Sequence, residues 1–256
     1  MHYVLLCDYG LDDAAATAQL FACRAPSDTV DIVPVGGNVS LDRSYRNACT
    51  LLANLPHSLQ GVRLVDTSAL PQPGEDLPSI HGKDGMGDLF SPAPCPACVP
   101  VVAFADWVKT IGPQDVLISL GPCTVTEKIL EICPVERLYL MAGSVSHHSN
   151  WQGREFNHAL DVGAFAACVK HPHRIATLDT CRHPYFNMVQ RPYTGSDPLM
   201  QTLMARHLEL ARARHADRCY VYDWVLMCHV LGLAEFGVTQ RRDPDGNCLS
   251  VLEVRP

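Results

Sequence analysis

Residues 4–14 constrain the fold more strongly than any other part of the chain, because they join an apolar run, an acidic turn and an alanine-rich stretch. The apolar residues 4–7 form the short unbroken run that is typical of a strand buried on both faces. Residues 12–21 have helical composition, with acidic residues in the first turn. This order of strand, turn and helix predicts the first unit of a parallel sheet flanked by helices.

The turn of this unit carries three carboxylates, which belong to Asp8, Asp12 and Asp13. In an open parallel sheet, ligands bind beyond the carboxyl ends of the strands, and the three side chains are expected there. An ordinary helix cap would account for Asp12 or Asp13 but not for Asp8. A helix N-terminus stabilises a carboxylate by only about 0.3–1 kcal/mol, too little to hold three together. We therefore predict that a hard cation or a substrate binds at this turn.

Apolar runs and helical segments alternate along the rest of the chain. Further strands are predicted at residues 30–35, 64–65, 115–120, 137–141 and 174–178. Further helices are predicted at residues 40–55, 126–132, 161–169, 199–214 and 225–231. The alternation predicts an α/β fold with an open, mostly parallel central sheet flanked by helices. The length of 256 residues suits one domain over residues 1–256.

The segments between these elements contain further polar residues. Residues 71–79 are predicted to form a loop rich in proline and acid, and the glycine-rich residues 81–88 a mobile surface loop. In the second loop, His81 either contacts a substrate or lies in solvent. Asn38, after the strand at 30–35, is either a ligand contact or a turn residue. Asn47 lies in the middle of a predicted helix and is expected to face solvent.

The composition excludes several classes of protein. A net charge of -7, with basic residues that form no long run, argues against nucleic-acid binding. No apolar stretch reaches the roughly 18 residues of a membrane span, and residues 1–3 lack the basic region of a signal peptide. We expect a cytoplasmic protein that acts on a small molecule, with no membrane partner. The twelve cysteines lie in apolar segments and are expected to be reduced, and Cys95 and Cys98 lack the second pair of a structural zinc site.

Several folds begin with a strand that ends in acid. Phosphatases of the haloacid dehalogenase type need a second aspartate where this chain has Gly10, and response-regulator receivers place an acidic pair directly at the strand end. The spacing of Asp8, Gly10, Asp12, Asp13 and Ala14 resembles instead the opening motif of the nucleoside hydrolases. These proteins are calcium-dependent N-ribohydrolases.

Further segments, spread from about residue 5 to residue 233, resemble the motifs of this family in the order in which the family has them. They are Gly37-Asn38-Val39 with Asn47-Ala48, His81-Gly82 with Gly85-Met86-Gly87, Gly121-Pro122-Cys123-Thr124, Met141-Ala142-Gly143, Glu155-Phe156-Asn157, and Asp223. Each motif is short, but their occurrence together and in order is specific. By this resemblance the chain is identified as a member of the nucleoside hydrolase family.

The resemblance implies a calcium site, which fits a cation that takes about 6–8 oxygen ligands. Asp8, Asp13 and Asp223 would supply carboxylates, and Thr124 its main-chain carbonyl. Asp8 would also act as the general base for the attacking water. The residues that would bind the substrate are Asp12, Asn38, His81, Asn150, Glu155 and Asn157. The resemblance further implies a homodimer or homotetramer.

The chain departs from the family at four points. Leu6 stands where the family has a further aspartate, Tyr9 where it has proline, and Tyr222 where base-protonating members have histidine. The spacing from Asn150 to Glu155 is one residue shorter than in the family. These departures concern the side of the site that would hold the base, and they leave the base of the substrate unspecified.

Tyr222 is the departure that bears on catalysis, because a phenol with an ordinary pKa of about 10 is a weaker acid than an imidazole. It would either donate a hydrogen bond to the departing base or stack on the base together with Tyr9 and Trp224. A tyrosine that is simply packed at the head of a helix is the structural alternative.

Two functions follow from the resemblance. The first is calcium-dependent hydrolysis of the N-glycosidic bond of a ribonucleoside to free base and ribose. The alternative is a nucleoside- or ribosyl-binding protein of the same fold with lost or altered catalysis, which would bind a nucleoside without cleaving it.

Overall fold

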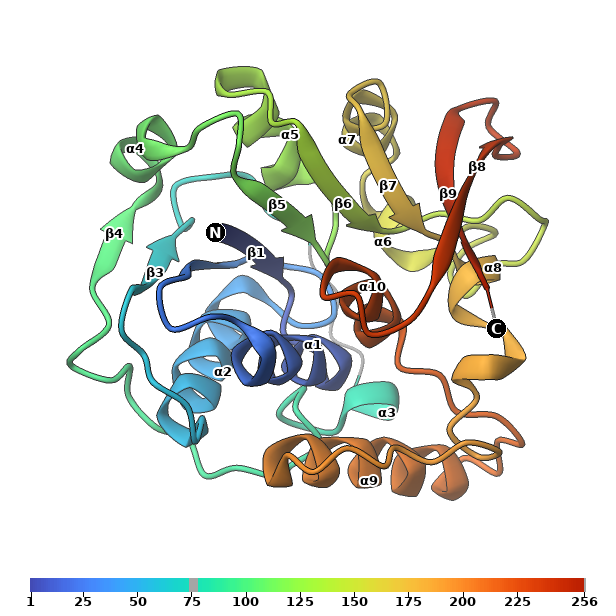
Figure 1. Cartoon of the computed structure of the whole chain (residues 1–256), viewed down its shortest axis with the longest axis horizontal. Helices are drawn as coiled ribbons and strands as arrows, with labels where there is room; N and C mark the ends of the chain where they lie inside the picture. Colours follow the sequence, from blue (N-terminus) through green and yellow to red (C-terminus); the bar gives the residue numbers. More distant parts are fainter. Residues whose placement is uncertain (74–77, 256) are drawn as a thin grey trace.

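The computed structural model describes residues 1–73 and 78–255, and within them the strands form one mostly parallel sheet (Figure 1). The strands are β1 (His2–Cys7), β2 (Thr29–Pro34), β3 (Val62–Asp66), β4 (Val101–Ala103), β5 (Val116–Ser119), β6 (Arg137–Met141), β7 (His173–Ala176), β8 (Phe236–Arg242) and β9 (Cys248–Val254). Their order across the sheet is β4-β3-β2-β1-β5-β6-β7-β9-β8. Among the named strands of the described residues, β8 and β9 alone pair antiparallel, so the predicted fold class is confirmed.

Helices cover both faces of the sheet. They are α1 (Leu11–Cys23), α2 (Leu41–Asn54), α3 (Pro78–His81), α4 (Phe104–Trp107), η1 (Val108–Thr110), α5 (Thr124–Ile132), α6 (Phe156–Leu160), α7 (Val162–Cys168), α8 (Leu178–Cys181), η2 (Pro184–Phe186), α9 (Pro198–Ala213) and α10 (Tyr222–Val230). Buried residues of α1, α2, α9 and α10 share one core, and those of α4, α5 and α7 share the other. Among the described residues, no helix is long and apolar enough to cross a membrane.

Strand β1 lies inside the sheet, between β2 and β5, and its side chains alternate between the two cores. Leu5 and Cys7 belong to one core, while Val4 and Leu6 belong to the other. From β1 the chain builds β2, β3 and β4 on one side, and then returns to build β5, β6 and β7 on the other. The carboxyl ends of β1 and β5 therefore form the topological switch point, where open α/β sheets bind ligands.

The predicted strands at residues 30–35, 64–65, 115–120 and 137–141 are confirmed as β2, β3, β5 and β6. The strand predicted at 174–178 ends earlier, because Leu178 begins α8. The hairpin of β8 and β9 was not predicted from the sequence. Residues 74–77 of the predicted loop at 71–79 lie outside the described residues.

One prediction about a polar side chain is wrong, and one of the two alternatives for another is excluded. Asn47 does not face solvent: it is buried, and its Nδ2 donates to the carbonyl oxygens of Tyr9 at 3.3 Å and Asp84 at 2.8 Å. His81 does not lie in solvent, because it ends α3 and is buried, and its contact with a substrate remains a prediction. Tertiary contacts decide both positions, because each side chain meets the turn after β1, and Nδ1 of His81 accepts from the main-chain N–H of Leu11 at 3.2 Å.

A buried ion network joins the first three strands to α4. Asp31 of β2 accepts hydrogen bonds from Nε and Nη2 of Arg63, at 2.7 and 2.6 Å, and from Nε1 of Trp107 at 2.6 Å. Nε2 of His2 lies 2.7 Å from Oδ2 of Asp31. Burial favours a higher pKa for Asp31, but the bonds from His2, Arg63 and Trp107 outweigh it and lower that pKa. Burial also opposes protonation of His2, yet its contacts with Asp31 and Asp115 raise its pKa above 6.5.

We predict that Asp31→Asn lowers the free energy of unfolding by about 3 kcal/mol, because it leaves a buried charge network without its anion. The stabilising effect of Asp31 is complete above pH ~4, the pKa of an unfolded aspartate, and is lost as pH falls through its lower folded value. The effect of His2 is complete below pH 6.5 and is lost as pH rises through its higher folded value. Urea unfolding across this range should show both contributions in the parent, whereas in the variant the contribution of Asp31 should be absent and that of His2 smaller, because Asp115 remains.

Asp106→Asn is the matched control, because Asp106 lies on the same helix as Trp107 and its only described ion pair, with Lys109, is on the surface. This variant should unfold within about 0.5 kcal/mol of the parent. Equal stabilities of the two variants would contradict the role given to Asp31.

Candidate functional site

The turn after β1 is shaped by main-chain hydrogen bonds to Asp13. Its Oδ1 accepts from the N–H of Asp8 at 3.1 Å, and its Oδ2 accepts from the N–H of Gly10 at 2.8 Å. Asp13 thus fills the capping role at the start of α1. The carboxylates of Asp8 and Asp12 are not used in this way, so the cap accounts for only one of the three acids.

A second acidic group reaches this turn from the far end of the chain. Helix α10 packs against α1 and carries Asp223 in its first turn. Oxygen atoms of Asp12, Asp13 and Asp223 all lie within 4.8 Å of one another, and the three side chains are buried. Oδ1 of Asp12 is buried without a hydrogen-bond partner. Three convergent carboxylates with an unused oxygen fit a divalent cation with oxygen ligands.

Burial strongly perturbs the ionisation of this cluster. Desolvation, followed by the charges of neighbouring aspartates, raises the pKa of Asp13 and of Asp223 well above the ordinary value. Desolvation raises the pKa of Asp8 to about 7. The same cause raises the pKa of Glu155 to about 7. A bound cation would offset this cost, because it favours the ionised forms.

Asp8 is held by Asn38 from the turn after β2. Its Oδ2 accepts from the main-chain N–H of Asn38 at 2.6 Å, and its Oδ1 accepts from the Asn38 Nδ2 at 3.0 Å. The carboxylate fits against bare backbone, because a Cβ atom at Gly37 would lie only 2.0 Å from Oδ2 of Asp8. Asn38 is therefore more than a turn residue, since both its amide groups orient Asp8.

Glu155 and Asn157 are fixed at the start of α6. Glu155 caps this helix, with Oε1 accepting from the N–H of Asn157 at 2.9 Å and Oε2 from the N–H of Gly143 at 2.8 Å. Nδ2 of Asn157 donates to the carbonyl oxygens of Leu120 at 2.6 Å and Met141 at 2.9 Å, at the ends of β5 and β6. Because both amide hydrogens are used, Oδ1 of Asn157 is the atom left to accept from a ligand.

A cavity of about 280 Å³ opens beside the acidic cluster. Eight of the predicted site residues line it, namely Asp12, Asn38, His81, Asn150, Glu155, Asn157, Tyr222 and Asp223. Asp8 and Asp13 lie behind this wall, in contact with Asn38. Thr124 is outside the lining, and its Oγ1 donates to Asp161 at 2.6 Å. Leu120, directly after β5, lines the cavity instead, and its carbonyl oxygen accepts from Asn157.

Tyr222 forms part of the cavity wall, but the predicted aromatic stack is wrong. Tyr9 is fully buried in the core, and the indole of Trp224 packs against Phe186 while its Nε1 donates to Gln19. Oη of Tyr222 accepts from Nε of Arg182 at 3.3 Å, which leaves its own O–H free to donate. Burial raises the pKa of Tyr222, so the phenol stays protonated at neutral pH.

Sequence reasoning missed the contribution of α9. His207, Leu210, Ala211 and Arg214 follow the i, i+3, i+4, i+7 spacing of one helix face and line the cavity. Nε2 of His207 is buried without a hydrogen-bond partner, and burial lowers the pKa of this histidine to about 4. The helical spacing was visible in the sequence, but it did not say which face meets a ligand.

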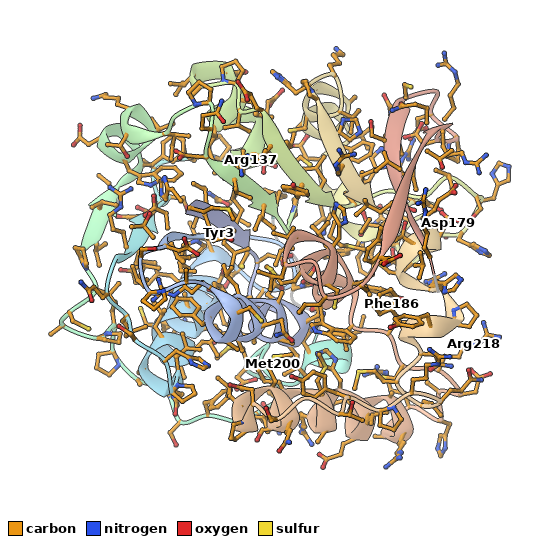
Figure 2. The ribbon with its side chains drawn as sticks, viewed as in Figure 1. Tyr3, Arg137, Asp179, Phe186, Met200 and Arg218 are labelled. Carbon is orange, nitrogen blue, oxygen red and sulfur yellow. The ribbon has the colours of Figure 1, made fainter. Side chains whose placement is uncertain are left out.

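Two other contributions come from the start of α6 and from loops. Trp151, Phe156 and Tyr220 add aromatic surface to the cavity wall. Arg218, labelled at the edge of the molecule in Figure 2, also lines the cavity and has an exposed side chain. The cavity therefore has an acidic end at the switch point, and an end with aromatic and basic side chains near α9.

A parallel α/β sheet with buried carboxylates and a small cavity at its switch point defines a ligand-binding protein suited to a divalent cation. A sequence model described as "Inosine-uridine preferring nucleoside hydrolase" matches residues 3–243. The chain belongs to this family, as its motifs indicated.

Among curated proteins, the non-specific ribonucleoside hydrolase RihC of Salmonella enteritidis is 34% identical over 179 residues, which cover 65% of this chain and 56% of that protein. RihC of Salmonella paratyphi B is 33% identical over the same shares. The chain thus matches little more than half the length of these relatives.

Solved structures of low sequence identity support the fold. The purine-preferring ribonucleoside hydrolase from Gardnerella vaginalis aligns with a TM-score of 0.70 and 21% identity, covering 100% of this chain and 88% of that one. The inosine-uridine preferring nucleoside hydrolase from Bacillus anthracis aligns with a TM-score of 0.65 and 14% identity, covering 99% and 90%.

We predict that Gly37→Ala displaces the Asp8 carboxylate, because the added methyl group would lie 2.0 Å from Oδ2. Such overpacking lowers the free energy of unfolding by about 1–3 kcal/mol, which thermal or urea unfolding measures. Gly112→Ala is the matched control, since its methyl group would lie 3.9 Å from the nearest side chain, that of Asp115. If both variants were as stable as the parent, the contact between Gly37 and Asp8 would not constrain the site.

Proposed function

We propose that this chain is a calcium-dependent ribonucleoside N-ribohydrolase that releases free base and ribose. The observation that carries the proposal is the convergence of Asp12, Asp13 and Asp223 at the switch point, where Asp12 and Asp223 line the cavity and Asp13 lies directly behind its wall. Membership of the nucleoside hydrolase family supports the same activity. The substrate class is a small-molecule ribonucleoside, and the base is left open.

The cation would be held by Asp13 and Asp223 of the acidic cluster together with Asp8. All of these donors are carboxylate oxygens, which favours Ca²⁺ over ions that prefer nitrogen or sulfur. When bound, the ion supplies positive charge that favours loss of a proton from the attacking water. The main-chain carbonyl predicted at Thr124 remains a prediction, and Leu120 is the alternative donor because it lines the cavity.

Asp8 is proposed as the general base. Burial raises the pKa of Asp8 to about 7 without an ion, and a bound cation would lower it again, so Asp8 would be ionised and able to accept a proton near neutral pH. Its two bonds from Asn38 fix the carboxylate while each oxygen keeps a second lone pair for the water. As the proton moves to Asp8, the water oxygen bonds to the anomeric carbon and the bond from that carbon to the base breaks, through an oxocarbenium-like transition state.

The sugar hydroxyls would be bound by the polar residues of the acidic end of the cavity. The unused Oδ1 of Asp12 and the Oδ1 of Asn157 are acceptors for hydroxyl donors. Asn38 and Glu155 lie in the same wall, as does the exposed Asn150. Fixing the ribose against these groups orients the anomeric carbon toward the water, which is a major source of rate enhancement.

At the other end of the cavity, Tyr222 would donate a hydrogen bond to the departing base. Its O–H is free for this because Arg182 donates to its oxygen. Of the three aromatic residues predicted to contact the base, only Tyr222 lines the cavity, since Tyr9 and Trp224 lie elsewhere. His81, whose Nδ1 accepts from Leu11, carries its hydrogen on Nε2 when neutral and is a second possible donor.

The alternative function is nucleoside binding without turnover. It is favoured by the absence of histidine at position 222, which removes the group that protonates the base in part of the family. Release of reducing sugar from a panel of ribonucleosides, with and without chelator, separates the two functions. Calorimetric binding of a nucleoside with no sugar release would establish the alternative.

We predict one bound Ca²⁺ per chain, and we expect Asp13→Ala to abolish both calcium binding and sugar release. Protons compete with the cation because burial raises the pKa values of these carboxylates. Affinity should therefore fall as pH is lowered from 8 to 6, as measured by calorimetry. Asp106→Ala is the control, because Asp106 is exposed and does not belong to the acidic cluster, and this variant should bind Ca²⁺ as the parent does. A preference for Zn²⁺ over Ca²⁺ at this cluster would overturn the proposed cofactor.

We predict that Tyr222→Phe lowers kcat on the order of 10²-fold at most, with little change in KM, because only a hydrogen bond is lost. Tyr222→Ala should also raise KM, since it removes cavity wall. Steady-state kinetics on the best substrate measures both. Parent rates in both variants would exclude Tyr222 from the chemistry, and His81 would be tested next.

A homodimer or homotetramer remains a proposal that rests on the resemblance to the family. Sedimentation velocity at micromolar concentration tests it. A single species at the 28.1 kDa of the monomer would contradict it.

A further inference from the structure

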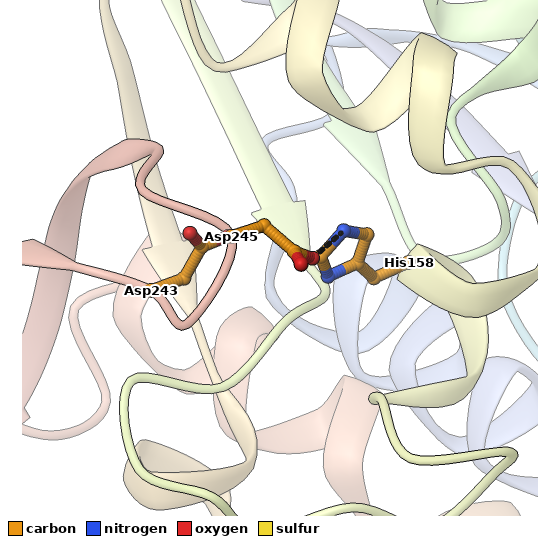
Figure 3. Close-up of side chains that lie close together, drawn as sticks. All are labelled: His158, Asp243 and Asp245. Carbon is orange, nitrogen blue, oxygen red and sulfur yellow. Dashed lines mark ion pairs between the residues drawn. The ribbon is translucent and has the colours of Figure 1, made fainter.

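A second group of metal-ligating side chains lies where the β8–β9 hairpin meets α6 (Figure 3). His158 belongs to α6, while Asp243 and Asp245 belong to the turn between β8 and β9. Potential ligand atoms of the three lie within 4.8 Å of one another. His158 and Asp243 are only 3% and 5% exposed, so two of the three groups are withdrawn from solvent.

The imidazole of His158 points to a ligand. Its Nε2 atom is buried and makes no hydrogen bond, although it lies 3.3 Å from Oδ2 of Asp245. Two ligands of one tetrahedral ion, each bound at about 2.0–2.1 Å, are separated by roughly 3.3 Å. The contact between His158 and Asp245 therefore has the wrong geometry for a hydrogen bond and a suitable separation for two ligands of one ion.

Each of the three side chains is oriented by a further contact. Nε and Nη2 of Arg154 donate to the Asp245 carboxylate at 2.9 and 3.0 Å. The main-chain N–H and Nδ2 of Asn247 donate to Asp243 at 2.8 and 2.9 Å. The ring of His158 stacks on Phe165, with centroids 3.9 Å apart. Such outer contacts fix the ligands of metal sites in the orientation that binding requires.

The charge and donor types indicate which ion would bind. Two carboxylates and one arginine leave a formal charge of -1 beside a neutral imidazole. A nitrogen ligand and a low negative charge favour a divalent transition ion over Ca²⁺ or Mg²⁺. A cavity of about 200 Å³, lined by His158, Asp245 and the loop residues His147 and His148, has room for water or a further ligand.

We propose that His158, Asp243 and Asp245 form a second metal site, which takes a divalent transition ion such as Zn²⁺. The ion clamps the hairpin to the start of α6. Glu155 and Asn157 lie at the start of α6, as does His158. A metal ion bound by His158, Asp243 and Asp245 therefore restricts the motion of the segment that supplies polar side chains to the wall of the main cavity. An ion pair of Arg154, Asp245 and His158 without metal is the competing explanation.

Co²⁺ is the probe, because coordination by imidazole in a tetrahedral site gives strong visible absorption, whereas six oxygen ligands give weak absorption. The parent, in excess Ca²⁺ to occupy the main cluster, should show a saturable absorption band with one Co²⁺ per chain, and its melting temperature should rise with Co²⁺. His158→Gln and Asp245→Asn should each weaken binding by at least about 10-fold and abolish the shift.

His148→Gln is the matched control, since this exposed histidine lines the same cavity without belonging to the cluster. It should retain the band. Circular dichroism establishes that the variants are folded, and Asp245→Asn, at the partly exposed rim, serves if His158→Gln does not fold. The proposal is overturned if the parent shows no absorption band. It is also overturned if His158→Gln or Asp245→Asn binds Co²⁺ as tightly as the parent, because Co²⁺ would then occupy surface histidines only.

Discussion

The burial of several carboxylates at one switch point is the constraint on which the rest of the structure depends. Asp8, Asp13 and Asp223 have exposures near zero, and removing such groups from water is costly unless a cation or hydrogen bonds compensate. The surrounding fold supplies the hydrogen bonds, from the turn after β1 and from Asn38. These hydrogen bonds offset only part of the free-energy cost of burying the carboxylates, and a bound cation would offset the rest. A cluster that is costly without its ion gives folding and ion binding a common driving force.

The sequence predicted the parts of the site that are local in the chain. The strand, turn and helix at residues 4–21 could be read from composition, and so could the acidic character of the turn. Asp223 was predicted as a site residue only through the resemblance to the family, because nothing in the sequence around it shows that α10 packs against α1. His207 was missed because the sequence does not say which face of α9 meets a cavity. Asn47 was placed in solvent because its partners, the carbonyls of Tyr9 and Asp84, are brought together only by tertiary packing.

The two ends of the cavity differ in how narrowly their side chains define the ligand group that binds there. At the acidic end, the hydrogen bonds of Asn38 and Asn157 leave few atoms for a ligand, so roles follow from which atoms remain unused. At the other end, aromatic and basic side chains come from α9 and from loops, and they specify no single base. Under the proposed function this asymmetry is expected, since ribonucleosides share the sugar and differ in the base.

Tyr9 gives the acidic turn a property that matters for ion selectivity. Its backbone has φ 38°, the left-handed region, which a proline could not adopt and which costs a bulky residue about 1–2 kcal/mol. The apolar ring is fully buried in the core, whereas its hydroxyl is buried without a hydrogen-bond partner and offsets part of the gain from burial. The turn is therefore anchored from within the core, and its carboxylates are in place before any ion arrives. A preorganised site loses little entropy on binding, but it cannot contract around a smaller ion, so it should discriminate by ionic radius.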